Sequence, residues 1–321
     1  MLKTRVRTVL EKGLFSTLKI FPKLKNIITD NLTIFVYHDI SNFPSDFSKA
    51  CDLNVSIKTF HNQISWISDN FNIIHPHQLR NATSLPDRSA MITFDDGFAG
   101  SFENGISYLV KKSIPSLIYL NMRTILEGRP MISALIQYLD DHSPNFRQFA
   151  EEHRLSQPYF HSITPDLLKQ YENKHGTPDF SLVNKYQGRL ASLSAVKSWS
   201  KESLLVFGNH LYDHWNSAAL SEKKFKAQYL KNQYALKDLQ VNDRFFAFTN
   251  GQPGSCFTHR EVNLLKELGA ERVFFSSGNT NKDENAYLLD RIGLSELDRS
   301  DSYLWFRMFR LCLRRNKKLN I

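Results

Sequence analysis

The chain has little cysteine and no long apolar run. Its 321 residues include three cysteines, Cys51, Cys256 and Cys312, which lie far apart and form no CxxC pair. An odd, scattered set of thiols argues against a disulfide framework and against a thiolate zinc site, and is compatible with a reducing compartment. No uninterrupted apolar stretch approaches the ~20 residues of a membrane-spanning helix. These absences argue against a disulfide-stapled protein and against a membrane-spanning one.

The first residues also lack the apolar centre of a secretory signal. They are basic, but Glu11, Lys12, Lys19 and Lys23 interrupt any apolar stretch. We therefore expect a protein that is not exported and that works in the cytoplasm.

Positive charge is concentrated at the two ends of the chain. Residues 1–29 hold seven Lys or Arg and one acid, and residues 302–321 hold six Lys or Arg and no acid. Each end therefore carries +6, so the remainder carries −3 within a net charge of +9 for the whole chain. A nucleic-acid groove would need basic residues on the folded body. We therefore expect no specific nucleic-acid partner.

Both ends mix apolar residues with basic ones. Residues 2–21 place Leu, Val and Phe on one helical stripe, and residues 303–310 combine aromatic residues with arginine. Such segments lie on anionic membrane surfaces, or they pack their apolar face against the folded body. Both alternatives remain open from the sequence. The first predicts peripheral attachment to the inner face of the cytoplasmic membrane.

Between the ends, the apolar pattern alternates strands with helices. Strands are expected at residues 32–37, 71–75, 90–95, 116–121, 204–207, 244–249 and 272–276. Helices are expected at residues 57–69, 98–112, 218–240 and 258–268. This alternation predicts a parallel sheet or barrel, and a distorted (β/α) barrel is the most economical architecture. In such barrels the functional side chains collect at the carboxyl ends of the strands.

Residues 122–200 interrupt the alternation. Prolines separate several helical pieces there, and no internal repeat is visible. We expect a partly helical insertion in a domain that spans residues 31–300, with an amphipathic segment at 1–30 and a basic tail at 301–321. The insertion is interpreted either as a lid or packing subdomain, or as a cap that selects the substrate.

Two acidic residues end the expected strand at 90–95. Asp95 and Asp96 stand in the sequence TFDDG, and adjacent carboxylates at a strand end are costly unless a cation compensates them. His210 and His214 lie four residues apart, so in a helical turn they would face the same way. One carboxylate and two histidines make a three-ligand site for a divalent metal, with a position left for water. Each pattern alone is weak, since a turn or a surface helix explains it; together, at strand ends, they favour the metal site.

TFDDG followed by HxxxH resembles the signature of the polysaccharide deacetylases, the NodB-homology group called carbohydrate esterase family 4. The resemblance runs from about residue 31 to residue 297 and includes the segments 33–40 and 245–254. It implies a (β/α) barrel of the NodB type. It also implies removal of an N-acetyl or similar acyl group from an amino sugar in a polysaccharide, oligosaccharide or lipid-linked glycan.

The same resemblance implies a role for each motif residue. Asp95 would be the catalytic base, while Asp96, His210 and His214 would bind a divalent metal ion, with zinc as the first choice. The residues themselves indicate metal-assisted acyl hydrolysis; the sugar comes from the resemblance.

The sequence departs from the family pattern at two places. The usual Leu-x-His near the C-terminus is replaced by Leu288-Leu289-Asp290-Arg291-Ile292, and the usual Arg is missing from the segment 249–253. His38 is a candidate for the missing proton donor, with a buried structural histidine as its alternative. Arg291 is a candidate for the arginine that orients Asp95, with a surface ion pair as its alternative. These departures support a second hypothesis, a catalytically silent relative that binds a glycan or glycolipid at the membrane surface.

Overall fold

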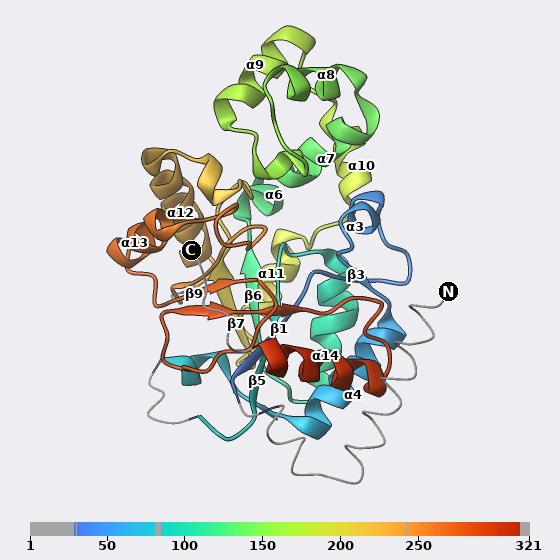
Figure 1. The fold of residues 1–321 in the computed structure, drawn as a ribbon, viewed down its shortest axis with the longest axis vertical. Helices are drawn as coiled ribbons and strands as arrows, with labels where there is room; N and C mark the ends of the chain where they lie inside the picture. Colours follow the sequence, from blue (N-terminus) through green and yellow to red (C-terminus); the bar gives the residue numbers. More distant parts are fainter. Residues whose placement is uncertain (1–28, 30, 81–84, 242, 315–321) are drawn as a thin grey trace.

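A parallel β-sheet occupies the centre of the molecule, and helices surround it (Figure 1). The computed structural model describes residues 29, 31–80, 85–241 and 243–314. The strands of this sheet are β1 (Thr33–Tyr37), β4 (Asn72–Ile73), β5 (Ser89–Phe94), β6 (Ser116–Leu120), β7 (Leu205–Asn209), β8 (Phe245–Ala247), β9 (Arg272–Phe275), β10 (Leu288–Asp290) and β11 (Ile292–Gly293). Their order is β10-β9-β8-β7-β6-β5-β1-β11, with β4 paired to β5 beside this path. All these pairings are parallel.

The two edges of the sheet meet at one residue. Strand β10 forms one edge and β11 the other, and only Arg291 separates them in the sequence. A chain that leaves one edge and enters the other after a single residue requires the sheet to curl until its edges come together. The architecture is therefore a nearly closed parallel barrel, which confirms the predicted fold.

Side chains alternate between the barrel interior and the surrounding helices. The interior holds a cluster of buried apolar residues: Leu32, Ile34, Ile74, Leu79, Met91, Leu117, Tyr119, Val206, Phe245, Ala247, Phe274 and Leu289. Because the period of a strand is two residues, Thr93 and Asp95 continue the inward row that Met91 begins, and Arg291 continues that of Leu289. The barrel is thus apolar within and becomes polar at the carboxyl ends of its strands.

Most of the predicted helices around the barrel are present, with changed bounds. They are α4 (Ile57–Asn70), α12 (Glu222–Lys237) and α13 (His259–Glu267), while the stretch predicted at 98–112 is a π-helix (Ser101–Ile106) followed by α5 (Ser107–Lys111). Helix α4 begins where the Ser56 side chain accepts a hydrogen bond from the Thr59 N–H. Its residues Phe60, Ile64 and Ile67 are buried at helical spacing, which fixes the face that packs on the barrel. A short helix, α3 (Asp46–Ala50), and a two-stranded sheet of β2 (Asp39–Ile40) and β3 (Asn54–Val55) complete this side.

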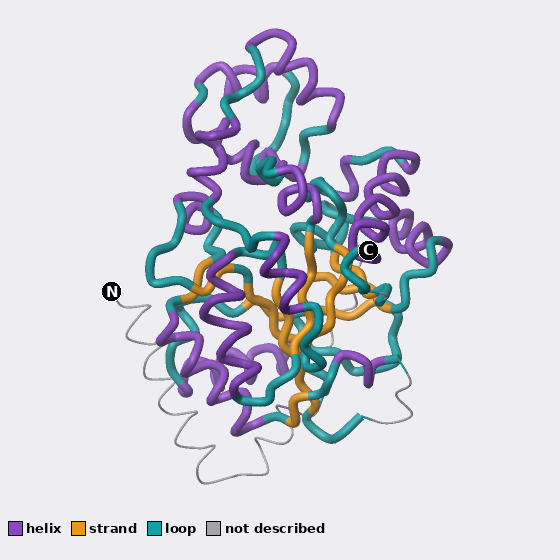
Figure 2. Tube along the Cα trace, turned by 180° about the vertical axis from the view of Figure 1, so that it is seen from behind, coloured by secondary structure: helices purple, strands orange, loops and turns teal. Residues whose placement is uncertain are grey.

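Residues 122–200, where the sequence predicts a partly helical insertion, are mostly helical. Their helices are α6 (Met122–Glu127), α7 (Ile132–His142), α8 (Pro144–Glu152), α9 (Pro165–His175), α10 (Phe180–Gln187) and α11 (Leu193–Trp199). Helices α7 to α10 stand as a lobe at the end of the barrel where β6 leads into α6, and Figure 2 shows the same lobe from behind. One apolar cluster joins the lobe to the barrel, since Leu135 and Phe146 belong to it together with Leu211 and Phe246. The insertion is therefore packed firmly on the barrel.

Helix α14 (Asp301–Arg314) packs its apolar face on the folded body. Leu304, Trp305 and Met308 are buried, and the Trp305 ring meets that of Trp66 on α4 edge to face at 5.3 Å. For residues 303–310 the structure thus shows intramolecular packing, while the stripe at 2–21 lies outside the described residues. Within the described ranges, no helix combines the length and apolar character that crossing a bilayer requires.

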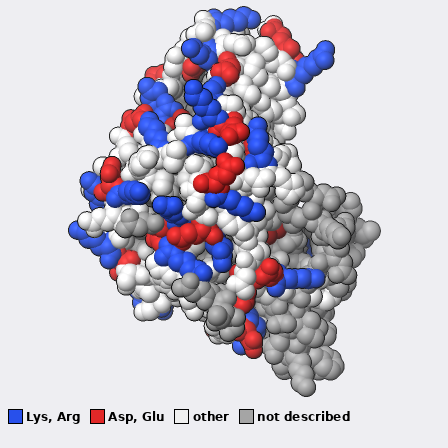
Figure 3. All heavy atoms as spheres, turned by 90° about the vertical axis from the view of Figure 1, so that its left-hand side faces the viewer, with Lys and Arg blue, Asp and Glu red and all other residues white. Residues whose placement is uncertain are grey.

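Charges of both signs are interspersed on the face that carries α12 and α13. Figure 3 shows Lys and Arg next to Asp and Glu across this face. Several form ion pairs, among them Lys226 with Glu222 at 2.7 Å and Lys224 with Asp166 at 2.7 Å. Neither sign forms a patch of its own among the described residues seen there, so this face offers no basic track for nucleic acid.

Candidate metal centre

Two adjacent carboxylates stand at the carboxyl end of β5. The N–H of Asp95 donates to the Tyr37 carbonyl at 3.0 Å, which continues the pairing of β5 with β1 and keeps the Asp95 side chain inside the barrel. Asp96 and Gly97 then adopt left-handed backbones, with φ of 70° and 80°. Alternation alone would send the two carboxylates to opposite faces, but this turn brings both to the mouth of the barrel. Both are buried.

The two histidines follow β7 in a loop, so the prediction of a helical turn is wrong. The N–H of His210 donates to the Leu120 carbonyl at 3.2 Å, which extends the pairing of β7 with β6. The Asn209 side chain then accepts from the N–H of Leu211 at 3.0 Å, and a local bond of this kind competes with a helix. Leu211 and His214 have φ near 60°, which turns the loop so that the two imidazole rings meet edge to face, with their centres 5.0 Å apart.

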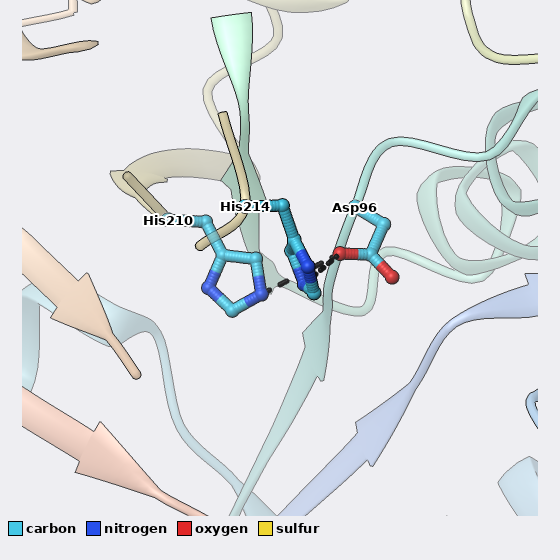
Figure 4. A group of neighbouring side chains, drawn as sticks. All are labelled: Asp96, His210 and His214. Carbon is cyan, nitrogen blue, oxygen red and sulfur yellow. Dashed lines mark ion pairs between the residues drawn. The ribbon is translucent and has the colours of Figure 1, made fainter. Parts of the chain in front are cut away.

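Three side chains selected from the sequence converge at this mouth (Figure 4). Asp96 Oδ1 lies 3.0 Å from His214 Nε2 and 3.5 Å from His210 Nε2. All three potential ligand atoms lie within 4.8 Å of one another, and all three residues are buried. They come from the ends of two parallel strands, which explains how residues more than a hundred positions apart meet.

The hydrogen-bond partners of His210, His214 and Asp96 indicate that a cation fits between their three facing atoms. His210 Nδ1 lies 2.8 Å from the Ala247 carbonyl. A carbonyl oxygen can only accept a hydrogen bond, so Nδ1 carries the proton. In the neutral ring, Nε2 therefore points its lone pair toward Asp96. His214 Nδ1 lies 2.9 Å from Ser133 Oγ. Asp96 Oδ1 is buried and lacks a hydrogen-bond donor among the described residues. Two imidazole nitrogens and one carboxylate oxygen form a donor set that suits zinc.

The charges of the site favour a cation as well. Burial by itself would lower the pKa of His210, but the Asp95 and Asp96 carboxylates outweigh it and raise that pKa. Burial by itself would raise the pKa of Asp96, but His214 and His210 hold it well below its usual range. The protein therefore keeps Asp96 ionised and attracts positive charge to the space between the rings.

Arg291 holds Asp95 from inside the barrel. Its Nη1 lies 2.7 Å from Asp95 Oδ1 and its Nη2 lies 2.8 Å from Oδ2, a bidentate pair. The guanidinium carbon lies 5.3 Å from the centre of the Tyr119 ring, and the whole side chain is 1% exposed. Burial would raise the pKa of Asp95, but Arg291 and His210 lower it. Arg291 is thus a buried partner of Asp95, and the surface ion pair considered as its alternative is wrong.

His38 lies on the solvent side of the same carboxylate. Its Nε2 is 3.9 Å from Asp95 Oδ2, and its side chain is 27% exposed. Burial lowers the pKa of His38, and the Asp96 and Asp95 carboxylates offset part of that shift. Within the described ranges, its ring nitrogens form no hydrogen bond, so a histidine fixed by structural hydrogen bonds does not describe it. A partly exposed imidazole beside Asp95 can exchange protons with a bound molecule.

Two contacts of the site carry no signal in the sequence. The Ala247 carbonyl orients His210, and a backbone oxygen has no sequence signature. Ser133 contacts His214 from the insertion, 81 residues away, and belongs to no motif.

A cavity of about 580 Å³ lies between α9 and α12. Asp213 and Trp215, the sequence neighbours of His214, are among its lining residues. The insertion thus borders the histidine loop, as both its interpretations require.

Comparison with known proteins gives a family match and a set of similar folds. The family model described as Polysaccharide deacetylase matches residues 82–273, more than half of the chain. No curated protein matches this chain.

Among solved structures, IcaB from Ammonifex degensii is 18% identical with a TM-score of 0.59, covering 87% of this chain and 97% of its own. PplD from Streptococcus pyogenes, solved in complex with acetate, is 13% identical with a TM-score of 0.58. The match covers 87% of this chain and 98% of PplD. A de-N-acetylase from Aggregatibacter actinomycetemcomitans is 12% identical with a TM-score of 0.55. The match covers 87% of this chain and 100% of the de-N-acetylase. At such identities the likeness is one of fold.

Proposed function

Since the chain belongs to the polysaccharide deacetylase family, we propose that it is a metal-dependent hydrolase that removes an N-acetyl or similar acyl group from an amino sugar. The sugar would belong to a polysaccharide, an oligosaccharide or a lipid-linked glycan. One observation carries the proposal: Asp96, His210 and His214 converge within 4.8 Å beside a second carboxylate, Asp95, which is held separately by Arg291. Metal-assisted acyl hydrolysis needs such a division between ligands and base.

In this proposal Asp96, His210 and His214 hold a divalent ion, with zinc as the first choice because of the two imidazole nitrogens. Such an ion, when bound, makes water more acidic and stabilises developing negative charge on oxygen. Asp95 stays outside the ligand set and takes the proton of the attacking water. Its lowered pKa keeps it ionised at neutral pH, and the bidentate contact with Arg291 fixes the direction of its oxygens.

His38 then donates a proton to the leaving amine. It stands on the open side of Asp95, where a substrate can reach it. Because its pKa is lowered, its protonated fraction falls as the pH rises through a value below that of an ordinary histidine. Turnover is therefore expected to show an alkaline limb that belongs to His38.

The alternative is a catalytically silent relative that binds a glycan or glycolipid. The residues 288–292 favour it, because they lack the histidine of the usual Leu-x-His motif. Support for the hydrolase comes from two other residues: Arg291 pairs with Asp95 at 2.7 Å, and the His38 imidazole lies 3.9 Å from the same carboxylate. Acetate release from N-acetylated amino-sugar oligomers separates the two: a silent relative binds the oligomers and releases none.

We also propose that the basic ends attach the protein to the inner face of the cytoplasmic membrane, close to lipid-linked sugars. The support is the charge of +6 at each end, since each basic residue near an anionic surface contributes ~1 kcal/mol. Full-length protein should pellet with anionic vesicles at low salt and less at high salt. A variant without residues 1–29 and 315–321, which removes basic charge from both ends and keeps α14, should stay in solution; equal pelleting of both proteins would contradict this attachment.

A further inference from the structure

The two histidines of the site are oriented by different parts of the molecule. The ring of His210 is fixed by the Ala247 carbonyl, which belongs to the neighbouring strand of the barrel. The ring of His214 is fixed by Ser133 Oγ, which belongs to the second residue of α7 in the insertion. His214 itself lies in a loop, with no helix or strand to set its direction. Its orientation therefore depends on contacts from outside the barrel strands.

The insertion ties down the loop that precedes His214. The N–H of Arg123 donates to the Tyr212 carbonyl at 3.1 Å. The Arg123 guanidinium pairs with Asp213 at 3.1 Å, and the N–H of Ile132 donates to the Asp213 carbonyl at 3.2 Å. Gln228 of α12 also bonds the backbone N–H and the side chain of Asp213. Among described residues, Ser133 alone forms a hydrogen bond with Nδ1 of the His214 ring.

We propose that Ser133 is a positioning residue for His214, and that the insertion thereby completes the metal centre. This inference rests on the proposed metal-dependent function. A histidine ligand binds a metal through a lone pair, so the opposite nitrogen must carry the proton. For His214 metal binding through Nε2 requires the proton on Nδ1, where the Ser133 hydroxyl oxygen can accept it. The serine contact thus holds the ring in the orientation in which Nε2 faces Asp96 at 3.0 Å.

The insertion then has a role beyond packing or substrate selection. Helix α7 is anchored independently of the metal, because the N–H of Met131 donates to the Gln187 side chain at 2.6 Å and Ser133 is buried. The hydroxyl is therefore held in place before a metal arrives. The expected consequence is a preorganised site whose affinity falls when the hydroxyl is removed and the fold is kept.

The test measures metal affinity without substrate. Full-length protein is stripped with a chelator, and Zn²⁺ is titrated in competition with a chromophoric chelator. Ser133→Ala should weaken Zn²⁺ binding by about 10–100-fold, the usual cost of losing such a partner. Ser133→Thr should restore affinity because it keeps the hydroxyl. Co²⁺ absorption should show an altered ligand field in the alanine variant only.

Ser143→Ala is the matched control. Ser143 lies at the other end of α7, and its hydroxyl contacts the Phe146 N–H and Tyr171, not the site. It should bind Zn²⁺ as the natural protein does. Thermal unfolding of each metal-free variant checks the fold, and Ser133→Thr keeps the test available if the alanine variant does not fold.

Equal affinity of Ser133→Ala and the natural protein would overturn the inference. So would equal weakening by Ser133→Ala and Ser143→Ala, which would indicate a loosened lobe, or failure of the threonine variant to restore binding. A natural protein that binds no Zn²⁺ would sink the proposed function and this inference together. If Zn²⁺ binding depends on Ser133 but the natural protein deacetylates no substrate, the proposed reaction is wrong and the role of Ser133 stands.

Discussion

Replacing Arg291 by Met removes the cation from a buried pair and leaves Asp95 with no bidentate partner. Breaking a buried pair by removing one member costs roughly 3–5 kcal/mol of folding free energy, because the remaining charge stays buried. We expect a loss of folding free energy in the upper part of that range, because both side chains are almost fully buried and are joined by two hydrogen bonds of 2.7 and 2.8 Å. Arg189→Met is the control: Arg189 pairs with Glu103 at 2.8 Å, but it is 75% exposed, so its loss should cost at most about 1 kcal/mol.

The pH dependence gives a second, independent readout of the same change. A carboxylate whose pKa is lowered on folding contributes stability above its unfolded pKa, and this contribution is lost as the pH falls through the folded value. In the natural protein Arg291 and His210 keep the pKa of Asp95 low against the effect of burial. Without Arg291, the effect of burial is less opposed, so the pKa of Asp95 should rise. The acid limb of turnover should therefore move to higher pH in Arg291→Met.

Urea denaturation at several pH values and a pH–rate profile measure the two effects. Arg291→Lys, which keeps the charge but not the two-pronged contact, should fall between Met and the natural protein. An acid limb that does not move, together with a stability loss no larger than that of Arg189→Met, would refute the view that Arg291 holds Asp95 ionised.

Two further predictions concern neighbouring residues of the site. Asp96→Ala should abolish stoichiometric Zn²⁺ binding, since two ligands rarely hold a tetrahedral ion; elemental analysis that finds the metal retained would contradict the ligand set. His38→Gln should lower kcat by roughly 10²–10⁴ and remove the alkaline limb of the pH–rate profile while the metal is kept. An unchanged profile would return His38 to a structural role.

The local parts of this site can be predicted from the sequence. TFDDG follows an apolar run that indicates a buried strand, and this alone places Asp95 and Asp96 at a strand end. The HxxxH pair is also recognisable, although the helical turn that its spacing suggests is wrong. The two rings meet because Asn209 and two left-handed residues bend a loop, and no residue pattern distinguishes that loop from a helical turn.

The parts that the sequence does not reveal depend on distant segments. Strands β10 and β11 have three and two residues, too few for a periodic signal, so the closure of the barrel at Arg291 leaves no pattern. The pairing of Arg291 with Asp95 can be named only as a candidate, because a sequence shows an arginine but not its burial. Ser133 gives no signal, since one serine in an irregular insertion resembles any other.

Acetate release from an N-acetylated amino-sugar oligomer, measured on natural protein and on Asp95→Asn with Zn²⁺ content determined in the same samples, tests the central claim most directly. The amide is nearly isosteric with the carboxylate but cannot accept a proton at neutral pH. We expect both proteins to bind one Zn²⁺, the natural protein to release acetate and to lose this activity when stripped of metal, and Asp95→Asn to release almost none. Near-normal acetate release by Asp95→Asn, or by the stripped natural protein, would contradict the account.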